Sequence, residues 1–176
     1  MEPLTLAVGI APRDSVDTDE LAAVAARTFP LACPPSTPAH NIASFIDTNL
    51  SATRFAEYLA DPRRAVFTAR HDDRIVGYAM LIRGEPDDPD DTDAAELSKL
   101  YVLPDYHGAG VATALMETTL ATAAEWGVRG VWLGVNQENQ RAQRFYLKSG
   151  FKVSGTRTFR VGARRENDYV MGRELG

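Results

Sequence analysis

Two glycines, Gly108 and Gly110, are placed where a backbone could bind a phosphate group. They follow the apolar run Leu100–Leu103 and precede a segment, from Val111 onward, whose apolar residues have helical spacing. A strand that turns through such a loop into a helix offers unpaired N–H groups and the positive end of the helix dipole to an anion. A side chain at either glycine would obstruct a pyrophosphate or disfavour the turn. The predicted phosphate-binding loop consists of His107, Gly108, Ala109, Gly110, Val111 and Ala112.

A second candidate constellation is a short helix that carries a tyrosine. Four of its residues are spaced i, i+3, i+4 and i+7 and therefore share one face: Ala142, Phe145, Tyr146 and Ser149. Asn139 is placed to cap this helix, and Asn136 ends the strand before it. Tyr146 is either an aromatic core residue of an amphipathic helix or a phenol that can donate a proton.

Together, residues 100–112 and 136–150 resemble the signature of the GNAT superfamily of acyl-CoA-dependent N-acetyltransferases. In that family the loop reads Gln/Arg-x-x-Gly-x-Gly/Ala, and the matching residues here are His107, Gly110 and Ala112. His107 departs from the usual glutamine or arginine, because it can donate a hydrogen bond but lacks a permanent charge. The resemblance implies that acetyl-CoA is the co-substrate and that its pyrophosphate binds this loop.

The resemblance also implies roles for the residues on either side of the loop. The backbone of residues 100–102 pairs with the pantetheine arm like an added strand, and one of its N–H groups stabilises the oxyanion of the reaction. The tyrosine that matches Tyr146 protonates the departing thiolate. The expected cofactor-binding residues are Leu100, Tyr101, Val102, His107, Gly108, Ala109, Gly110, Val111, Ala112, Asn136, Asn139, Ala142, Phe145 and Tyr146.

Glu96 is the candidate general base, and with Tyr146 it completes the expected catalytic pair. An amine is mostly protonated at neutral pH and must lose a proton before it attacks a thioester. Strict strand alternation places Glu96 on one face with Ser98, Leu100 and Val102, although a bulge, which is frequent in the family at this place, would break that parity. The alternative for Glu96 is a strand-end carboxylate in solvent.

The composition limits the classes of protein to consider. A chain of 176 residues with 44% apolar residues fits one domain, 1–176. The net charge of −5, with no basic block or stripe, argues against a nucleic-acid partner and is compatible with a cationic substrate. No His/Cys cluster has metal-ligand spacing, so no metal is expected.

The compartment follows from the cysteine count and from hydropathy. One cysteine, Cys33, allows no internal disulfide and favours a reducing compartment. It lies in a proline-rich loop away from the two motifs, which makes it a poor candidate nucleophile. The sequence lacks a secretory leader pattern and an apolar stretch that could span a bilayer, so we expect a cytoplasmic protein without a membrane partner.

The order of elements predicts an α/β (α+β) fold, with a mixed, mostly antiparallel sheet of about seven strands and helices on both faces. The GNAT resemblance supplies the topology, in which the fourth and fifth strands splay apart and the cofactor enters the gap. The helix capped by Asp17 is expected to break at 30–38, and the last two strands to flank a connection at 161–167. The expected strands are 5–12, 64–71, 74–83, 96–103, 130–135, 151–159 and 168–174, and the later helices are 40–49, 51–60, 110–126 and 139–149.

The acceptor is constrained less than the cofactor. Residues 37–59, 130–136, 158–162 and 168–171 look similar to bacterial spermidine/spermine-type acetyltransferases, which makes a polyamine a candidate. The acidic segment 85–93 would attract a polycation, or it is simply a solvated loop. Other amines remain open: amino acids, aminoglycoside-like compounds and a protein N-terminus.

Two other classes of function compete with an enzyme. The first is a non-catalytic acetyl-CoA sensor, against which the presence of Tyr146 argues. The second is an interaction domain, because the closing strands could form an edge that pairs with a second copy in a homodimer. A homodimer is also compatible with catalysis.

Overall fold

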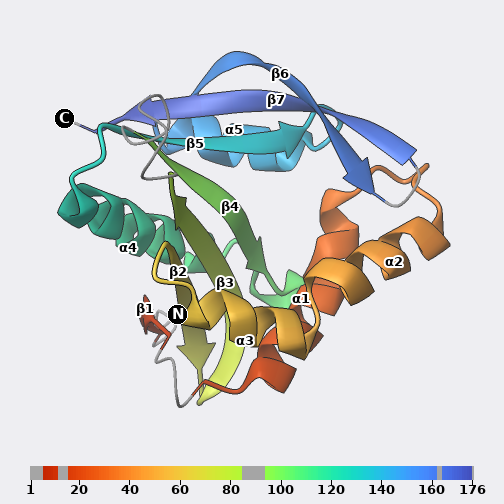
Figure 1. The fold of residues 1–176 in the computed structure, drawn as a ribbon, viewed down its shortest axis with the longest axis horizontal. Coiled ribbons are helices and arrows are strands. Elements are labelled where there is room, and N and C mark those ends of the chain that lie inside the picture. Colours follow the sequence, from red (N-terminus) through yellow and green to blue (C-terminus); the bar gives the residue numbers. More distant parts are fainter. Residues whose placement is uncertain (1–5, 12–15, 85–93, 162–163, 176) are drawn as a thin grey trace.

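A seven-stranded sheet forms the centre of the computed structural model, which describes residues 6–11, 16–84, 94–161 and 164–175 (Figure 1). The strand order is β1-β2-β3-β4-β5-β7-β6. Among the described strands, β4 and β5 pair in parallel and the other neighbours pair antiparallel, as the sequence predicts. The strands are β1 (Ala7–Ile10), β2 (Arg64–His71), β3 (Arg74–Arg83), β4 (Ala94–Val102), β5 (Gly130–Asn136), β6 (Lys152–Val161) and β7 (Arg164–Glu174).

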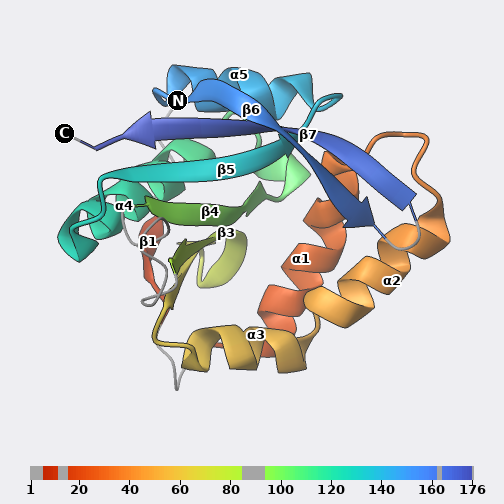
Figure 2. The ribbon, with the colours of Figure 1, turned by 45° about the horizontal axis from the view of Figure 1, so that its top comes forward.

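Helices cover both faces of this sheet (Figures 1 and 2). Gly77 of β3 faces Leu115 of the fourth helix, whereas the next residue, Tyr78, contacts the ring of Phe55 in the third. Successive strand residues point to opposite faces, so these two helices lie on opposite sides of the sheet. The helices are α1 (Thr18–Ala32), α2 (Ala39–Asn49), α3 (Ala52–Ala60), α4 (Val111–Trp126) and α5 (Gln140–Lys148), with a 3₁₀ turn at Pro104–Tyr106.

The parallel strands β4 and β5 stay together over a short length only. Their register runs from Ala94 opposite Gly130 to Glu96 opposite Trp132, while β4 continues to Val102 and β5 to Asn136. Beyond Glu96 the two strands diverge, which Figure 1 shows clearly. The splay that the GNAT resemblance implies is therefore present.

A bulge in β4 corrects the expected parity of its side chains. Met80 lies opposite Lys99 but Leu81 lies opposite Leu97, so Ser98 is an additional residue in β4. Glu96 and Tyr101 consequently share the face of the sheet that α1 and α3 cover. Leu100 and Val102 do not share a face with Glu96, because the bulge shifts the alternation by one residue.

Local signals fix most ends of the elements, with two corrections. The side chain of Asp17 accepts the N–H of Glu20, so the predicted N-cap of α1 is present. The expected break at 30–38 is present but begins later than expected: α1 runs to Ala32 and residues 33–38 are not helical. The proline removes one helical N–H, but its carbonyl still accepts the N–H of Cys33. The β6–β7 pairing also extends to Val161 opposite Arg164, so most of the expected connection 161–167 is strand.

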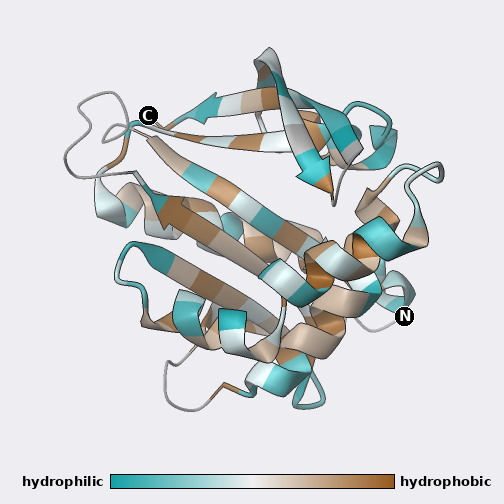
Figure 3. Ribbon diagram, turned by 45° about the vertical axis from the view of Figure 1, so that its right-hand side comes forward, coloured by the Kyte–Doolittle hydropathy of each residue, from teal (hydrophilic) through white to brown (hydrophobic). Residues whose placement is uncertain are grey.

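The core lies between the sheet and its helices. Figure 3 shows the central strands as largely hydrophobic. Tyr78 of β3 and Phe55 of α3 are fully buried on the side of the first three helices. Phe67 of β2 is also fully buried, and Leu115 of α4 is fully buried on the other side of the sheet. The apolar faces of the strands and helices therefore pack together on both sides of the sheet.

Candidate active site

A cleft with a volume of about 690 Å³ opens where β4 and β5 diverge. Its walls come from β4, β5 and α5, from the glycine loop before α4, from the end of α1, from α2 and α3, and from the β6–β7 hairpin. The two motifs that the sequence analysis singled out thus lie on one cavity. The expected site residues on this cavity are Glu96, Leu100, Tyr101, Val102, His107, Gly108, Gly110, Ala112, Asn136, Asn139, Ala142, Phe145 and Tyr146.

Two expected cofactor-binding residues do not line the cavity. Val111 is 1% exposed and packs in the core beneath the loop, because it begins the apolar stripe of α4. Ala109 is exposed at the tip of the loop. If these two residues bind the cofactor, they do so through the backbone.

The glycine loop has the geometry of an anion cradle. Gly108 and Gly110 have φ values of +81° and +87°, a region in which residues with a Cβ are strained. The first bond of α4 runs from the N–H of Ala114 to the carbonyl of Gly110, so the N–H groups of residues 111–113 precede the helical ladder. A Cβ on either glycine would have open space around it. The loop therefore fits a pyrophosphate group at the positive end of the α4 dipole.

His107 is held by two partners, and these define its tautomer. Its Nε2 lies 2.8 Å from the carbonyl oxygen of Val102, to which it must donate. Its Nδ1 is then an acceptor, and the guanidinium of Arg141 in α5 donates to it. The neutral imidazole thus replaces the family's glutamine or arginine, and Arg141 brings a permanent positive charge to the loop from another element.

Tyr146 is positioned by the cap of its helix and by its aromatic neighbours. Asn139 accepts the N–H of Ala142 at 3.2 Å, which confirms the expected N-cap of α5. The Tyr146 ring contacts Phe151 at a centroid distance of 5.9 Å. Burial raises the pKa of Tyr146 to about 12, so the phenol is protonated at physiological pH and can act as a proton donor.

Glu96 lies in the wall of the cleft, with 25% of its side chain exposed. The guanidinium of Arg157 in β6 is 3.9 Å from its carboxylate. The alternative of a strand-end carboxylate in open solvent therefore does not describe its position. The base role itself stays a prediction.

Several residues of the cleft were missed by sequence reasoning because they come from distant segments. Arg157 and Asp168 face each other across the β6–β7 hairpin, with Nε 3.3 Å from Oδ2, and Glu166 accepts a hydrogen bond from Thr37 at 3.1 Å. The i, i+2 spacing of Glu166 and Asp168 could have signalled a shared strand face. The proposed loop at 161–167 concealed that signal.

The position of Cys33 differs from the expected one. It lies on the same cavity as the two motifs and not away from them, because α1 continues past Pro30 and delivers it there. Burial, with a smaller contribution from Glu166, raises the pKa of Cys33 to about 11. The thiol is therefore protonated at neutral pH, and Cys33 remains a poor nucleophile for an electrostatic reason.

Among the cleft carboxylates of Glu96, Glu166 and Asp168, that of Asp168 is the most enclosed, with 7% of its side chain exposed. Burial raises the pKa of Asp168, and the charge and hydrogen bond of Arg157 oppose that rise. Asp168 lies opposite Asn136, the last residue of β5, so this carboxylate is close to the open end of the splay.

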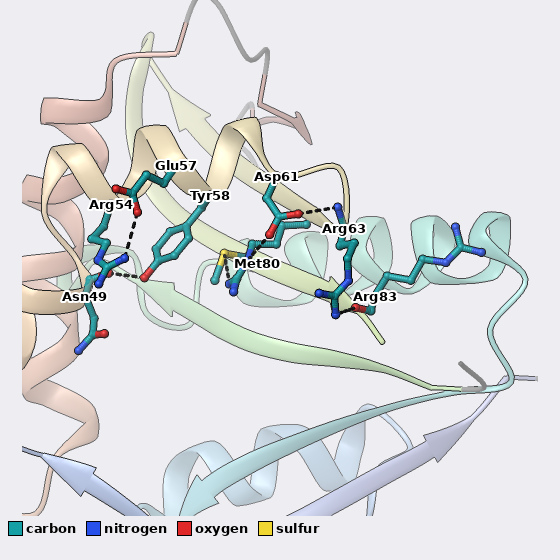
Figure 4. Close-up of polar contacts among 9 residues, drawn as sticks. Asn49, Arg54, Glu57, Tyr58, Asp61, Arg63, Met80 and Arg83 are labelled. Carbon is teal, nitrogen blue, oxygen red and sulfur yellow. Dashed lines mark hydrogen bonds and ion pairs between the residues drawn. The ribbon is translucent and has the colours of Figure 1, made fainter. Parts of the chain in front are cut away.

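The outer wall of the cleft is held by polar contacts of α3 (Figure 4). The hydroxyl of Tyr58 donates to the carbonyl of Asn49 at 2.7 Å, and both residues line the cavity. Arg54 pairs with Glu57 at 3.0 Å on the exposed side of the same helix. Tyr58 is thus fixed at the rim by a bond to the end of α2.

Two further observations concern metals and membranes. In the four described ranges, no group of three or more His, Cys, Asp or Glu side chains could hold a metal ion. No helix within those ranges has both the length and the apolar character needed to cross a membrane. The acidic segment 85–93, for which attraction of a polycation is one expectation, lies outside the described residues.

The splayed sheet, the glycine loop and the tyrosine helix define an acyl-CoA-dependent acetyltransferase, and comparison with known proteins agrees. The model of the Acetyltransferase (GNAT) family matches residues 26–151. The chain belongs to this family, whose members use acetyl-CoA, and it is an N-acetyltransferase.

Particular relatives place the chain within the family. It is 72% identical over 159 residues to an N-acetyltransferase of Mycobacterium tuberculosis of uncharacterised function, covering 90% of this chain and 98% of the relative. The fold matches that of the PaiA N-acetyltransferase of Thermoplasma acidophilum in complex with coenzyme A, with a TM-score of 0.82, 20% identity, and coverage of 98% and 100% of the two chains. It also matches the ribosomal-protein-S18-alanine N-acetyltransferase of Escherichia coli, with a TM-score of 0.71, 20% identity, and coverage of 98% and 95%.

Proposed function

We propose that the enzyme transfers the acetyl group of acetyl-CoA to a primary amine of a small molecule by direct attack in a ternary complex. The observation that carries this proposal is the position of Glu96 and Tyr146 on one cleft that leads to the glycine loop. A base for the amine and an acid for the thiolate are then available without a covalent intermediate. Cys33, the one thiol of the chain, is held protonated.

The proposed steps follow from the chemistry of the reactants. Glu96 takes a proton from the acceptor ammonium, directly or through water, and the freed lone pair attacks the thioester carbon. A backbone N–H of residues 100–102 stabilises the oxyanion that forms. When the carbon–sulfur bond breaks, Tyr146 donates its proton to the sulfur.

A polyamine is the acceptor that we propose. The cleft is lined by three carboxylates, those of Glu96, Glu166 and Asp168, and by two cations near them, Lys99 and Arg157, while Arg141 lies beside the glycine loop. Carboxylates in a cleft raise the local concentration of cations. Together with the net charge of −5, this favours an acceptor with more than one positive charge. The cytoplasm, where acetyl-CoA and polyamines meet, is the proposed location.

The experiment that tests this function is a free-thiol release assay with acetyl-CoA and a panel of amines. The panel contains spermidine, spermine, amino acids, aminoglycosides and a peptide with a free N-terminus. Turnover with polyamines alone supports the proposed acceptor, and turnover with another amine replaces it. Acetyl-CoA binding without turnover on any amine would favour the sensor function.

A further inference from the structure

Arg157 lies closely against the backbone of β5. It starts on β6 and reaches across β7, and its guanidinium carbon is 5.5 Å from the ring centroid of Trp132. A Cβ built on Gly134 would lie 2.5 Å from both Cζ and Nε of Arg157. The contact requires a glycine at this position because of space, since no side chain fits between the guanidinium and the strand.

The same guanidinium joins carboxylates from two different strands. Its Nε is 3.3 Å from Oδ2 of Asp168 on β7, and its Nη1 is 3.9 Å from Oε2 of Glu96 on β4. Both strands flank β5 in the sheet. Arg157 therefore bridges the sheet beside the point where β4 and β5 separate, and all three side chains line the cleft.

We propose that Arg157 is a positioning residue for acetyl transfer: packed against Gly134, it holds the carboxylates of Glu96 and Asp168 toward the acceptor, so that one of the two receives the ammonium proton. This inference rests on the proposed function. In the step concerned, an N–H bond of the ammonium breaks, its proton passes to a carboxylate, and the lone pair attacks the thioester carbon. A planar guanidinium suits this task, because it can bond two carboxylates in fixed directions.

The charges around Asp168 set the sign of the expected pH effect. It faces Arg157 from β6, Glu166 along its own strand and Tyr101 from β4. The other carboxylate, that of Glu96, faces Arg157 from β6 and Lys99 along its own strand. Burial and Glu166 raise the pKa of Asp168, while Arg157 lowers it. Loss of Arg157 therefore raises the pKa of Asp168 further, and a reaction that needs the ionised carboxylate loses activity first at low pH.

Two substitutions that act from opposite sides of the contact test this inference. Arg157→Gln removes the charge, and Gly134→Ala displaces the guanidinium but leaves every charge in place. Both are expected to lower kcat/KM for the acceptor about tenfold at neutral pH and to move the acid limb of its pH profile upward. Arg157→Lys should recover part of the rate, since it restores the charge but not the fork. Gly155→Ala is the matched control, because a Cβ there meets no atom within 4 Å.

Tryptophan fluorescence reports the position of Arg157 independently of activity. In a Trp126→Phe background, Trp132 is the remaining tryptophan of the two in the chain, and its emission reports the guanidinium on its ring. Gly134→Ala and Arg157→Gln should change this emission in the same direction, and Gly155→Ala should not change it. Affinity for acetyl-CoA should stay within about twofold of the wild type for all variants.

The outcomes separate the inference from the function on which it rests. A wild-type protein that releases no thiol with any amine contradicts the proposed function. An active wild type whose two variants keep the normal rate and pH profile overturns the role of Arg157. Equal losses of acetyl-CoA affinity and of rate would also overturn it, because they show a structural effect on the whole cleft.

Discussion

The phenol of Tyr146 shows how one buried side chain can be assigned a chemical step. Its pKa is raised to about 12 by burial, so it holds its proton across the physiological range. We predict that Tyr146→Phe lowers kcat about 100-fold, because general acids contribute on that order, while the ring still fills its site against Phe151. Single-turnover kinetics and acetyl-CoA binding measure the two effects separately. An unchanged kcat would remove Tyr146 from the reaction.

Arg141 is the residue that we expect to replace the missing charge of the loop. It reaches His107 from α5, and both residues line the cleft. Arg141→Gln should weaken acetyl-CoA binding about tenfold and reduce the dependence of that binding on salt, because one cation beside the pyrophosphate is lost. Titration calorimetry at two salt concentrations checks this. Arg144→Gln, on the same helix but outside the lining of the cavity, is the control.

The sequence identified some site residues and missed others for one physical reason. Glu96, Tyr146 and the glycine loop lie in short motifs whose spacing is readable along the chain. The roles of Arg157 and Asp168 depend on contacts with β4 and β5, which lie far away in sequence. Cys33 was misplaced because the continuation of α1 past a proline depends on local hydrogen bonds.

At the scale of elements, the β2–β3 hairpin allows a clean test of turn chemistry. Asp72 and Asp73 both have positive φ values, 52° and 62°, as a two-residue hairpin turn requires. Asp73→Gly should stabilise the fold by about 0.5 kcal/mol, because glycine adopts this conformation without strain. Asp73→Ala should destabilise it. Thermal unfolding of the two variants decides the matter, and a lower melting temperature for the glycine variant would contradict the argument.

Element boundaries were predictable where a local signal exists. The paired aspartates, the cap at Asp17 and the cap at Asn139 all end or begin elements as expected. The bulge at Ser98 has no such signal, since it arises from the pairing of β4 with β3. The extended β6–β7 hairpin was likewise hidden, because polar residues such as Glu166 are buried there by contact with Thr37.

At the scale of the whole molecule, the cleft divides the sheet into two parts, and the cofactor should join them. We predict that acetyl-CoA slows amide hydrogen exchange on both β4 near Val102 and β5 near Asn136, because its arm pairs like an inserted strand. ADP, which lacks the pantetheine arm, should protect the glycine loop alone. Protection confined to the loop with acetyl-CoA as well would contradict a strand-like arm.

The overall architecture was predictable as an order of elements with an expected splay, and the structure confirms the mixed sheet with helices on both faces. The width and lining of the cleft were not predictable, because they depend on how α1 and the β6–β7 hairpin approach from opposite ends of the chain. The identity of the acceptor depends on these contacts, which explains why the cofactor motifs alone do not determine it.

The short parallel seam between β4 and β5 also has a mechanical consequence. Three residue pairs, from Ala94–Gly130 to Glu96–Trp132, join two blocks that are each held by longer antiparallel ladders. If β1 and β7 were pulled apart, the load would pass through this seam, and it would rupture before either block. A ligand that contacts both strands beyond the seam would raise the force needed to separate them. The rupture force would therefore report whether the cofactor is bound.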